Sequence, residues 1–475
     1  MAIFFLRLLF ISLMGLMPQD AYYYFYSQHP ALSYFDHPPA LAYIIRIFTE
    51  IFGKHVFVIK LADTFISLLS VVAFYFLSRR FLSGQRAGNA VIIFFSTLML
   101  TILSLVSTPD VPLILFSCLS LLSLHDAIFR NRHYHWILAG IWMGLAFDSK
   151  YTAIFLPAGL ILFLIVSDKY RRLFFSPGPW ISILFLFITA LPVIIWNIEN
   201  NFASFKFQSS ERAGSVHINP VGFFGVLGHQ AAILMPILFF FLIFILYKTF
   251  NKHIVKRLRI TPEKLFLFCF FLPVFLGFLA VSWIYWVKLN WMMPAYITGI
   301  ILISIYATQR LIRLQVIFSL AVHLMLAAEV VLYPVPIRSD DTWIGWDDLA
   351  KQVDTLKSKH PERFIFAADD YKTSAVLNFY LPEFVYGRNV IGEPALQFDY
   401  IGTDLALLKG RDAFFINSVP RFSNEGKENQ FPPSLQEHFE SVIETDPIII
   451  MKNGKAIRKF LVFECRNYRG PAGGR

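Results

Sequence analysis

The sequence predicts a mainly α-helical membrane protein that crosses the bilayer many times and ends in a small α/β domain. Hydrophobic residues make up 56% of its 475 residues. Charged residues make up only 16%, whereas soluble domains have roughly 25%. Long apolar runs fill residues 1–333, while residues 334–475 have the mixed composition of a soluble domain. We therefore predict a membrane domain over 1–333 and a soluble domain over 334–475.

The net charge of +10 belongs to the membrane part of the chain. Residues 1–333 hold 24 Lys and Arg against 12 Asp and Glu, and residues 334–475 hold 18 against 20. In a membrane protein, basic residues in the loops mark orientation. The surplus therefore does not indicate a nucleic-acid partner, and we expect none.

Apolar windows between charged breaks predict about eleven membrane helices. The first is short for a span, and the pair at 135–167 is alternatively one broken helix. The predicted segments are 1–18, 56–81, 87–106, 111–129, 135–147, 151–167, 180–197, 221–247, 265–286, 291–307 and 314–333.

The loops predict the orientation of these helices. The loops that follow the even-numbered spans contain 16 Lys and Arg, and those that follow the odd-numbered spans, up to residue 290, contain 6. Positive residues favour the cytoplasm, so we expect a cytoplasmic N-terminus. An odd number of spans then places the C-terminal domain outside, in a multi-pass protein of the inner (plasma) membrane.

Acidic residues of the membrane part gather on the predicted outer side. Seven of its twelve acids fall there, namely Asp20, Asp36, Glu50, Asp110, Asp148, Glu199 and Glu211. Burying an unpaired carboxylate costs several kcal/mol, so such a group indicates a site. Each acid taken alone could also be a solvated loop residue, and Asp110 could simply cap the helix that follows.

The C-terminal part predicts a small α/β domain. An amphipathic helix begins at Trp346, a short strand covers 364–367, and a second helix covers 371–380. Asn453-Gly454 between two apolar runs predicts a β-hairpin. No catalytic group of residues is evident in this domain, so we expect a lid or an acceptor platform over the outer face.

The densest polar stretch is the first outer loop, and motifs spaced along the whole chain resemble those of one enzyme family. The loop contains Asp20-Ala21-Tyr22-Tyr23 and Phe35-Asp36-His37-Pro38-Pro39. Further motifs are Thr108-Pro109-Asp110, Ser149-Lys150-Tyr151, Trp196-Asn197, Ser204-Phe205-Lys206-Phe207-Gln208, Asn290-Trp291, Gly345-Trp346-Asp347 and Tyr371-Lys372-Thr373. Together they resemble the GT-C-type, polyprenyl-phosphate-sugar-dependent glycosyltransferases of family 39, the protein O-mannosyltransferase and lipid A aminoarabinose-transferase kin.

The resemblance implies a GT-C fold and an inverting transfer of a hexose or pentose from a polyprenyl-phosphate donor to a lipid, protein or glycan acceptor. The family has Asp-Glu before Ala-Tyr-Tyr, where this chain has Gln19-Asp20. We expect Asp20 to have taken over as general base; alternatively the base is displaced or the chain is an inactive relative. Asp110 is expected to orient the acceptor or the base.

The remaining site residues follow from the same resemblance. A leaving phosphate needs cationic or hydrogen-bonding neighbours, and the expected donor-binding residues are His37, Lys150, Tyr22, Tyr34, Lys206 and Arg212. For Lys150 the alternative is an ion pair with Asp148. Asp36 and His229 are expected to hold a divalent metal ion (Mg, Mn or Zn), although two ligands are too few to establish a site. His229 could instead be hydrogen-bonded to a neighbouring helix.

A transporter or flippase of lipid-linked sugars is the alternative from another functional class. Transporters often show internal repeats and broken helices at the bilayer midplane. The sequence shows no evident repeat, and its acids gather at the outer boundary. These features favour the transferase.

Overall fold

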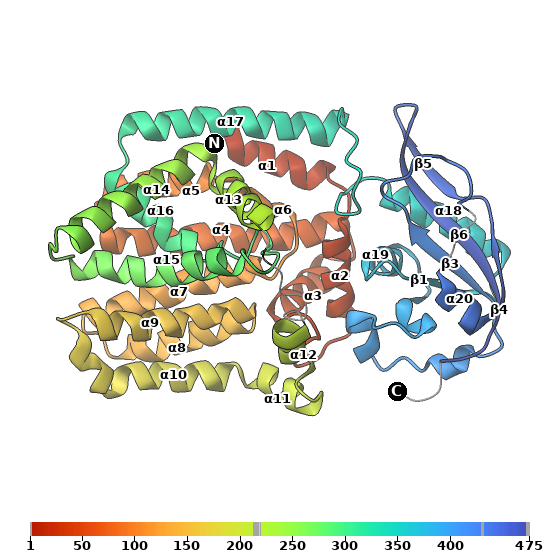
Figure 1. Cartoon of the computed structure of the whole chain (residues 1–475), viewed down its shortest axis with the longest axis horizontal. Helices are drawn as coiled ribbons and strands as arrows, with labels where there is room; N and C mark the ends of the chain where they lie inside the picture. Colours follow the sequence, from red (N-terminus) through yellow and green to blue (C-terminus); the bar gives the residue numbers. More distant parts are fainter. Residues whose placement is uncertain (1, 212–217, 219, 429–431, 472–475) are drawn as a thin grey trace.

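In the computed structural model, a bundle of long helices lies beside a C-terminal domain built on a β-sheet (Figure 1). The structure describes residues 2–211, 218, 220–428 and 432–471. Arg212 therefore lies outside the described residues. Most helices of the bundle run along the long axis of the molecule, and the C-terminal domain covers one of its two ends.

The helices before the C-terminal domain are α1 (Ala2–Leu13), α2 (Pro18–Gln28), α3 (Ala40–Phe52), α4 (Val56–Phe81), α5 (Gly84–Phe95), α6 (Leu98–Leu105), α7 (Asp110–Phe129), α8 (Tyr134–Phe147), α9 (Phe155–Val166), α10 (Pro177–Thr189), α11 (Leu191–Glu199), α12 (Ala203–Lys206), α13 (Pro220–Leu234), α14 (Pro236–Phe250), α15 (Pro262–Val281), α16 (Ala295–Tyr306) and α17 (Gln309–Leu332). Short 3₁₀ and π turns are η1 (Tyr151–Ile154), η2 (Arg171–Phe175), η3 (Phe207–Glu211) and η4 (Asn251–Val255).

Each of the eleven predicted membrane segments falls on a helix or on a pair of consecutive helices. By length and composition, four described helices could span a membrane, or up to seven if each bent pair is one span. The helices α8, α16 and the stretch Tyr151–Val166 are shorter and apolar. The structure thus shows a mainly helical membrane protein with four to seven candidate spans.

Three predicted segments are not the straight helices that the sequence suggested. The pairs α5–α6, α10–α11 and α13–α14 bend by 62°, 51° and 111°. The sharpest bend lies at Met235, whose φ is +70°, directly before Pro236. Proline restricts the residue before it and has no N–H to continue the helical hydrogen bonds. The expected helix 221–247 is therefore two helices.

Polar contacts join loops at the two ends of the bundle. At the far end from the C-terminal domain, Arg80 makes two 2.7 Å hydrogen bonds to Asp126, joining α4 to α7. Arg86 reaches the carbonyl of Ile305 at the same end. At the opposite end, Lys150 pairs with Asp110. The loop that contains Arg80 and Arg86 thus lies at the far end.

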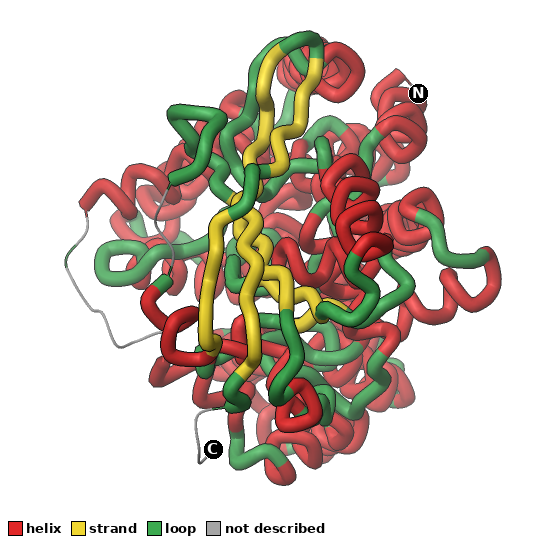
Figure 2. Tube along the Cα trace, turned by 90° about the vertical axis from the view of Figure 1, so that its right-hand side faces the viewer, coloured by secondary structure: helices red, strands yellow, loops and turns green. Residues whose placement is uncertain are grey.

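The C-terminal domain is a mixed sheet with helices and short turns around it. Its strands have the order β2-β1-β3-β6-β4, and β5 also pairs with β6. β1 is parallel to β2 and β3, whereas β6 is antiparallel to β3, β4 and β5. Figure 2 shows these strands in front of the bundle. The elements are α18 (Trp346–Lys359), β1 (Phe364–Ala367), α19 (Lys372–Tyr380), β2 (Val385–Tyr386), η5 (Arg388–Ile391), η6 (Leu396–Tyr400), η7 (Leu405–Leu408), β3 (Ala413–Ser418), α20 (Pro433–His438), β4 (Phe439–Glu444), β5 (Ile448–Lys452) and β6 (Lys455–Tyr468).

The core of the C-terminal domain continues into the first loop of the membrane part. One cluster of buried side chains includes Tyr22 and Phe25 of α2 together with Trp346, Phe379 and Phe398 of the C-terminal domain. Phe25 stacks on Phe398 with ring centroids 4.4 Å apart. Burial of aromatic surface is a large stabilising contribution, so the domain is fixed firmly on α2.

Candidate active site

A cavity of about 470 Å³ lies where the bundle meets the C-terminal domain. Its wall combines the first loop, the loops after α6 and α8, the segment before α16 and the start of α19. The polar and aromatic lining residues are Gln19, Tyr22, Tyr23, Asp36, His37, Thr108, Lys150, Tyr151, Thr152, Gln208, Lys288, Asn290, Trp291 and Tyr371. Segments far apart in the sequence therefore form one site.

Asp36 is the carboxylate on the wall of this cavity among the residues described. The hydroxyl of Tyr22 donates to its Oδ1 at 3.2 Å, and that of Tyr26 donates to the same oxygen. Burial and the neighbouring Asp36 raise the pKa of Tyr22 well above its ordinary value. The phenol therefore keeps its proton and remains a donor to the carboxylate.

Lys150 brings a positive charge to the cavity. Its Nζ donates to both oxygens of Asp110, at 2.9 and 2.8 Å, and Asn290 donates to Oδ2 of the same carboxylate. Asp110 is fully buried, whereas Lys150 lines the cavity. The alternative pairing of Lys150 with Asp148 is wrong, because the partner of Lys150 is Asp110.

The structure places Asp20, the expected general base, away from the cavity wall. Its Oδ2 accepts from Lys60 Nζ at 2.8 Å and from the backbone N–H of Met17 at 3.0 Å. Its Oδ1 accepts from the N–H of Ser107 at 2.9 Å. The side chains of Asp20 and Lys60 are both fully buried, and neither lines the cavity. A general base must come within hydrogen-bond reach of the proton it removes. In this structure Asp20 bonds to Lys60, Met17 and Ser107, and its role as base stays a prediction.

Comparison with known proteins agrees with this architecture. Residues 36–196 match the family model described as dolichyl-phosphate-mannose-protein mannosyltransferase. Within that segment the chain is similar to this family. The resemblance that we inferred from the sequence motifs is thereby confirmed.

Individual relatives extend the comparison beyond this segment. The lipid A galacturonosyltransferase RgtD of Rhizobium johnstonii is 24% identical over 286 residues, which is 60% of this chain and 59% of the relative. ArnT from Cupriavidus metallidurans in the apo state has a TM-score of 0.62 at 14% identity, covering 97% of this chain and 96% of ArnT. The same ArnT bound to undecaprenyl phosphate has a TM-score of 0.60 at 15% identity, with the same coverage. The chain therefore shares the ArnT fold along nearly its whole length.

Two further residues expected at the site lie elsewhere. Tyr34 is fully buried, donates to the carbonyl of Tyr26 at 2.9 Å and stacks on that ring. It supports a residue that binds Asp36 but does not face the cavity. Lys206 is exposed and is not part of the cavity wall.

The described residues do not fit the expected divalent metal site. No three His, Cys, Asp or Glu side chains among them are grouped to hold an ion. Asp36 accepts hydrogen bonds from two tyrosines, and the His229 ring packs against Trp286. His229 does not line the cavity either. A metal requirement stays a prediction.

The structure adds residues that our sequence interpretation did not assign to the site. Lys288 places a second ammonium on the cavity wall, and Tyr371 comes from the C-terminal domain. Lys288 is a single basic residue between two apolar helices, and this position in the sequence could have indicated a site residue. Tyr371 stacks on Tyr22 with ring centroids 4.0 Å apart. That contact joins residues more than 300 positions apart and has no local signal.

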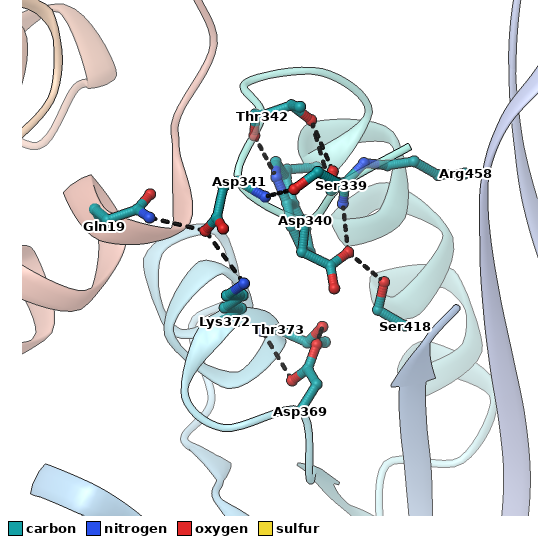
Figure 3. Close-up of polar contacts among 11 residues, drawn as sticks. Gln19, Ser339, Asp340, Asp341, Thr342, Asp369, Lys372, Thr373, Ser418 and Arg458 are labelled. Atoms are coloured by element: carbon teal, nitrogen blue, oxygen red, sulfur yellow. Dashed lines mark hydrogen bonds and ion pairs between the residues drawn. The ribbon is translucent and has the colours of Figure 1, made fainter. Parts of the chain in front are cut away.

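Polar contacts beside this stack fasten the C-terminal domain to α2. Gln19 Nε2 donates to Asp341 Oδ1 at 2.8 Å, and Lys372 Nζ lies 3.1 Å from the same oxygen. Figure 3 shows Gln19 on the membrane part pointing toward Asp341 and Lys372 on the C-terminal domain. Gln19, in place of an acid, thus serves as an amide donor to a carboxylate across the domain boundary.

Proposed function

We propose that the protein is an integral membrane glycosyltransferase that moves a sugar from a polyprenyl-phosphate donor to an acceptor of the cell envelope. The observation that carries this proposal is the cavity between bundle and C-terminal domain, with Lys150 and Lys288 and the carboxylate of Asp36 on its wall. Lipid-phosphate donors place the reacting carbon at the membrane boundary. A cavity at the end of a membrane bundle suits such a donor.

The donor phosphate is assigned to the basic residues of the wall. Phosphate gains negative charge as the glycosyl bond breaks, and fixed cations stabilise that charge. Lys150 suits this role because Asp110, which also accepts from Asn290, holds its position. Lys288 and His37 complete the cationic and hydrogen-bonding set on the wall.

Asp36 is assigned as the general base in place of Asp20. It faces the cavity, and two tyrosine hydroxyls orient its carboxylate. An acceptor hydroxyl or amine beside Asp36 would lose its proton as it attacks the anomeric carbon, while the bond from that carbon to the phosphate oxygen breaks. A single displacement of this kind inverts the anomeric centre.

The acceptor that we favour is lipid A, because the relative RgtD is a lipid A galacturonosyltransferase. The alternatives are a protein or another envelope glycan.

The orientation proposed is the one that the loop charges predict: eleven spans in the inner membrane, a cytoplasmic N-terminus, and the cavity and C-terminal domain outside. Contacts between Gln19 and Asp341 support it, since they require an even number of crossings between α2 and the C-terminal domain.

A reconstituted assay tests the proposal. Purified protein in lipid nanodiscs receives lipid A and undecaprenyl phosphate carrying aminoarabinose, galactosamine, galacturonic acid or mannose. We expect one donor to give lipid A with the added sugar mass, measured by mass spectrometry, and free undecaprenyl phosphate. Asp36→Asn is expected to lower turnover by about 10²–10⁴-fold, the range of general base catalysis.

The transporter alternative predicts a different result. In proteoliposomes, a flippase would move the lipid-linked sugar between leaflets without forming free undecaprenyl phosphate. Such movement without transfer to any lipid, protein or glycan acceptor would overturn the proposal. Reporter fusions that place residue 475 in the cytoplasm would overturn the orientation.

A further inference from the structure

A second cavity, of about 930 Å³, lies at the far end of the bundle from the candidate active site. Its wall is formed by the end of α9 and the residues after it, by α14 and by α15 with the loop that precedes it. The volume is in the range of about 300–1,000 Å³ typical of ligand sites. No residue of this cavity lines the candidate active site.

Helix α14, which follows the bend after α13, forms one wall of this cavity. After Pro236, α14 approaches α16, where Leu242 lies near the position that a Cβ of Gly299 would occupy, at 3.7 Å. The later part of α14, including Leu246, lines the cavity opposite α9 and α15. The space between these helices is therefore bounded by side chains of three elements and is not filled by them.

The depth of the cavity is apolar and its mouth is basic. Phe268, Leu272 and Leu276 of α15 line the apolar part, while Lys169 and Arg259 lie in the loops at its end. Lys169 and Arg259 are both exposed. The acid in the same loop, Asp168, is paired with Arg171. The charge left at the mouth is thus positive.

A hydrogen bond fixes the position of one of the two basic loops. His253 Nδ1 lies 2.7 Å from the carbonyl oxygen of Leu258, the residue before Arg259. Both His253 and Leu258 line the cavity. This contact holds the start of the loop 258–261 beside η4, so that Arg259 is presented at the mouth.

We propose that this cavity binds one anionic phospholipid, with an acyl chain between α9, α14 and α15 and its phosphate at Lys169 and Arg259. Basic pockets between membrane helices on the cytoplasmic side are suited to acidic headgroups. The sugar donor fits less well, because its phosphate is required at Lys150, at the opposite end of the bundle. If the sugar donor occupied this cavity with its phosphate at Lys150, Lys169 and Arg259 would have no phosphate to bind.

Lipid-dependent stability tests the inference. Delipidated protein in a mild detergent receives phosphatidylglycerol, phosphatidylcholine or undecaprenyl phosphate, and thermal unfolding is measured. We expect phosphatidylglycerol to raise the melting temperature and phosphatidylcholine to leave it nearly unchanged. In the double variant Lys169→Gln/Arg259→Gln, the apparent affinity for phosphatidylglycerol should fall by about tenfold or more, since 1.4 kcal/mol corresponds to tenfold.

Two further variants separate the site from general charge. Arg310→Gln/Arg313→Gln removes two exposed charges from the start of α17, outside the cavity, and should keep the full response to phosphatidylglycerol. Leu272→Trp fills the apolar part while keeping both bases, and should abolish the response. The proposal would be overturned by an equal loss in the Arg310/Arg313 control or by an unchanged response in the Lys169/Arg259 variant. It would also be overturned if undecaprenyl phosphate raised the melting temperature and phosphatidylglycerol did not.

Discussion

Lys60 and Asp20 form an ion pair in which both side chains are fully buried. Removing one partner of such a pair costs about 3–5 kcal/mol, because the other charge stays buried without compensation. We predict that Lys60→Met lowers the melting temperature strongly, and that Lys60→Met/Asp20→Asn recovers part of the loss. Thermal unfolding in detergent measures both. Asp20→Asn with normal stability and no transfer would instead restore Asp20 as the base.

Asp148 gives the protein a pH-dependent stability. Burial raises the pKa of its carboxyl from 3.8 to about 7, and its Oδ1 has no hydrogen-bond partner among the described atoms. Between these values the unfolded chain releases a proton that the folded chain keeps, so stability falls as pH rises from about 4 to about 7. We predict that Asp148→Asn flattens the melting temperature between pH 5 and pH 8. A pH profile as steep as that of the wild type would contradict this.

At the scale of elements, α8 and α10 pack through two glycines four residues apart. A Cβ on Gly140 would lie 2.4 Å from the carbonyl oxygen of Ser182, and one on Gly144 would lie 2.4 Å from Cβ of Thr189. Small residues at this spacing let membrane helices approach closely. The two helices are held at a distance that larger side chains would prevent.

Substitution of these glycines should separate the helices. We predict that Gly140→Val or Gly144→Val destabilises the protein by about 1–3 kcal/mol, the range for overpacking. Gly88→Ala on α5 is the matched control, since its Cβ would have no neighbour within 4 Å. Thermal unfolding distinguishes them. Equal stability of Gly144→Val and the wild type would show that α10 can move away freely.

The elements themselves were largely predictable. The strand 364–367, the helix beginning at Trp346 and the hairpin at Asn453-Gly454 all match the structure. Both hairpin residues have positive φ, at +50° and +73°, as a tight turn of this type requires. The apolar windows did not predict the bends, because hydropathy depends on residue composition and does not report a change in helix direction. Proline at 236 was the available local signal for the sharpest of them.

At the scale of the whole molecule, the sequence grouped the acids on one side of the bundle but did not show how each acid is used. The sequence around an acid in a loop does not show whether that acid pairs with a lysine, as Asp20 and Asp110 do, or faces a cavity, as Asp36 does. The difference depends on partners such as Lys60, which stands 40 residues away inside a helix. Only the packed structure shows which carboxylate remains on the cavity wall.

The C-terminal domain should therefore be required for transfer. Tyr371 lines the cavity and stacks on Tyr22, which binds Asp36. Loss of this ring would free Tyr22 to move and shift Asp36, and a misplacement of about 1 Å can reduce turnover by roughly 10²-fold. We predict such a loss for Tyr371→Ala, beyond the lower melting temperature that removal of the packed ring causes. Transfer of sugar to lipid A by the purified variant measures it.

The contacts of Asp341 with Gln19 and Lys372 should also support turnover, with a smaller effect than the Tyr371 ring. Asp341 accepts from Gln19 and pairs with Lys372, directly after Tyr371. Asp341→Asn keeps the shape of the side chain but removes the charge that both partners bind, so we expect about a tenfold loss of turnover. Asp347→Asn is the matched control, because Asp347 pairs only with Lys351 on the exposed face of α18 among the described residues. Equal activity of both variants would mean that aromatic packing alone holds the two domains in register.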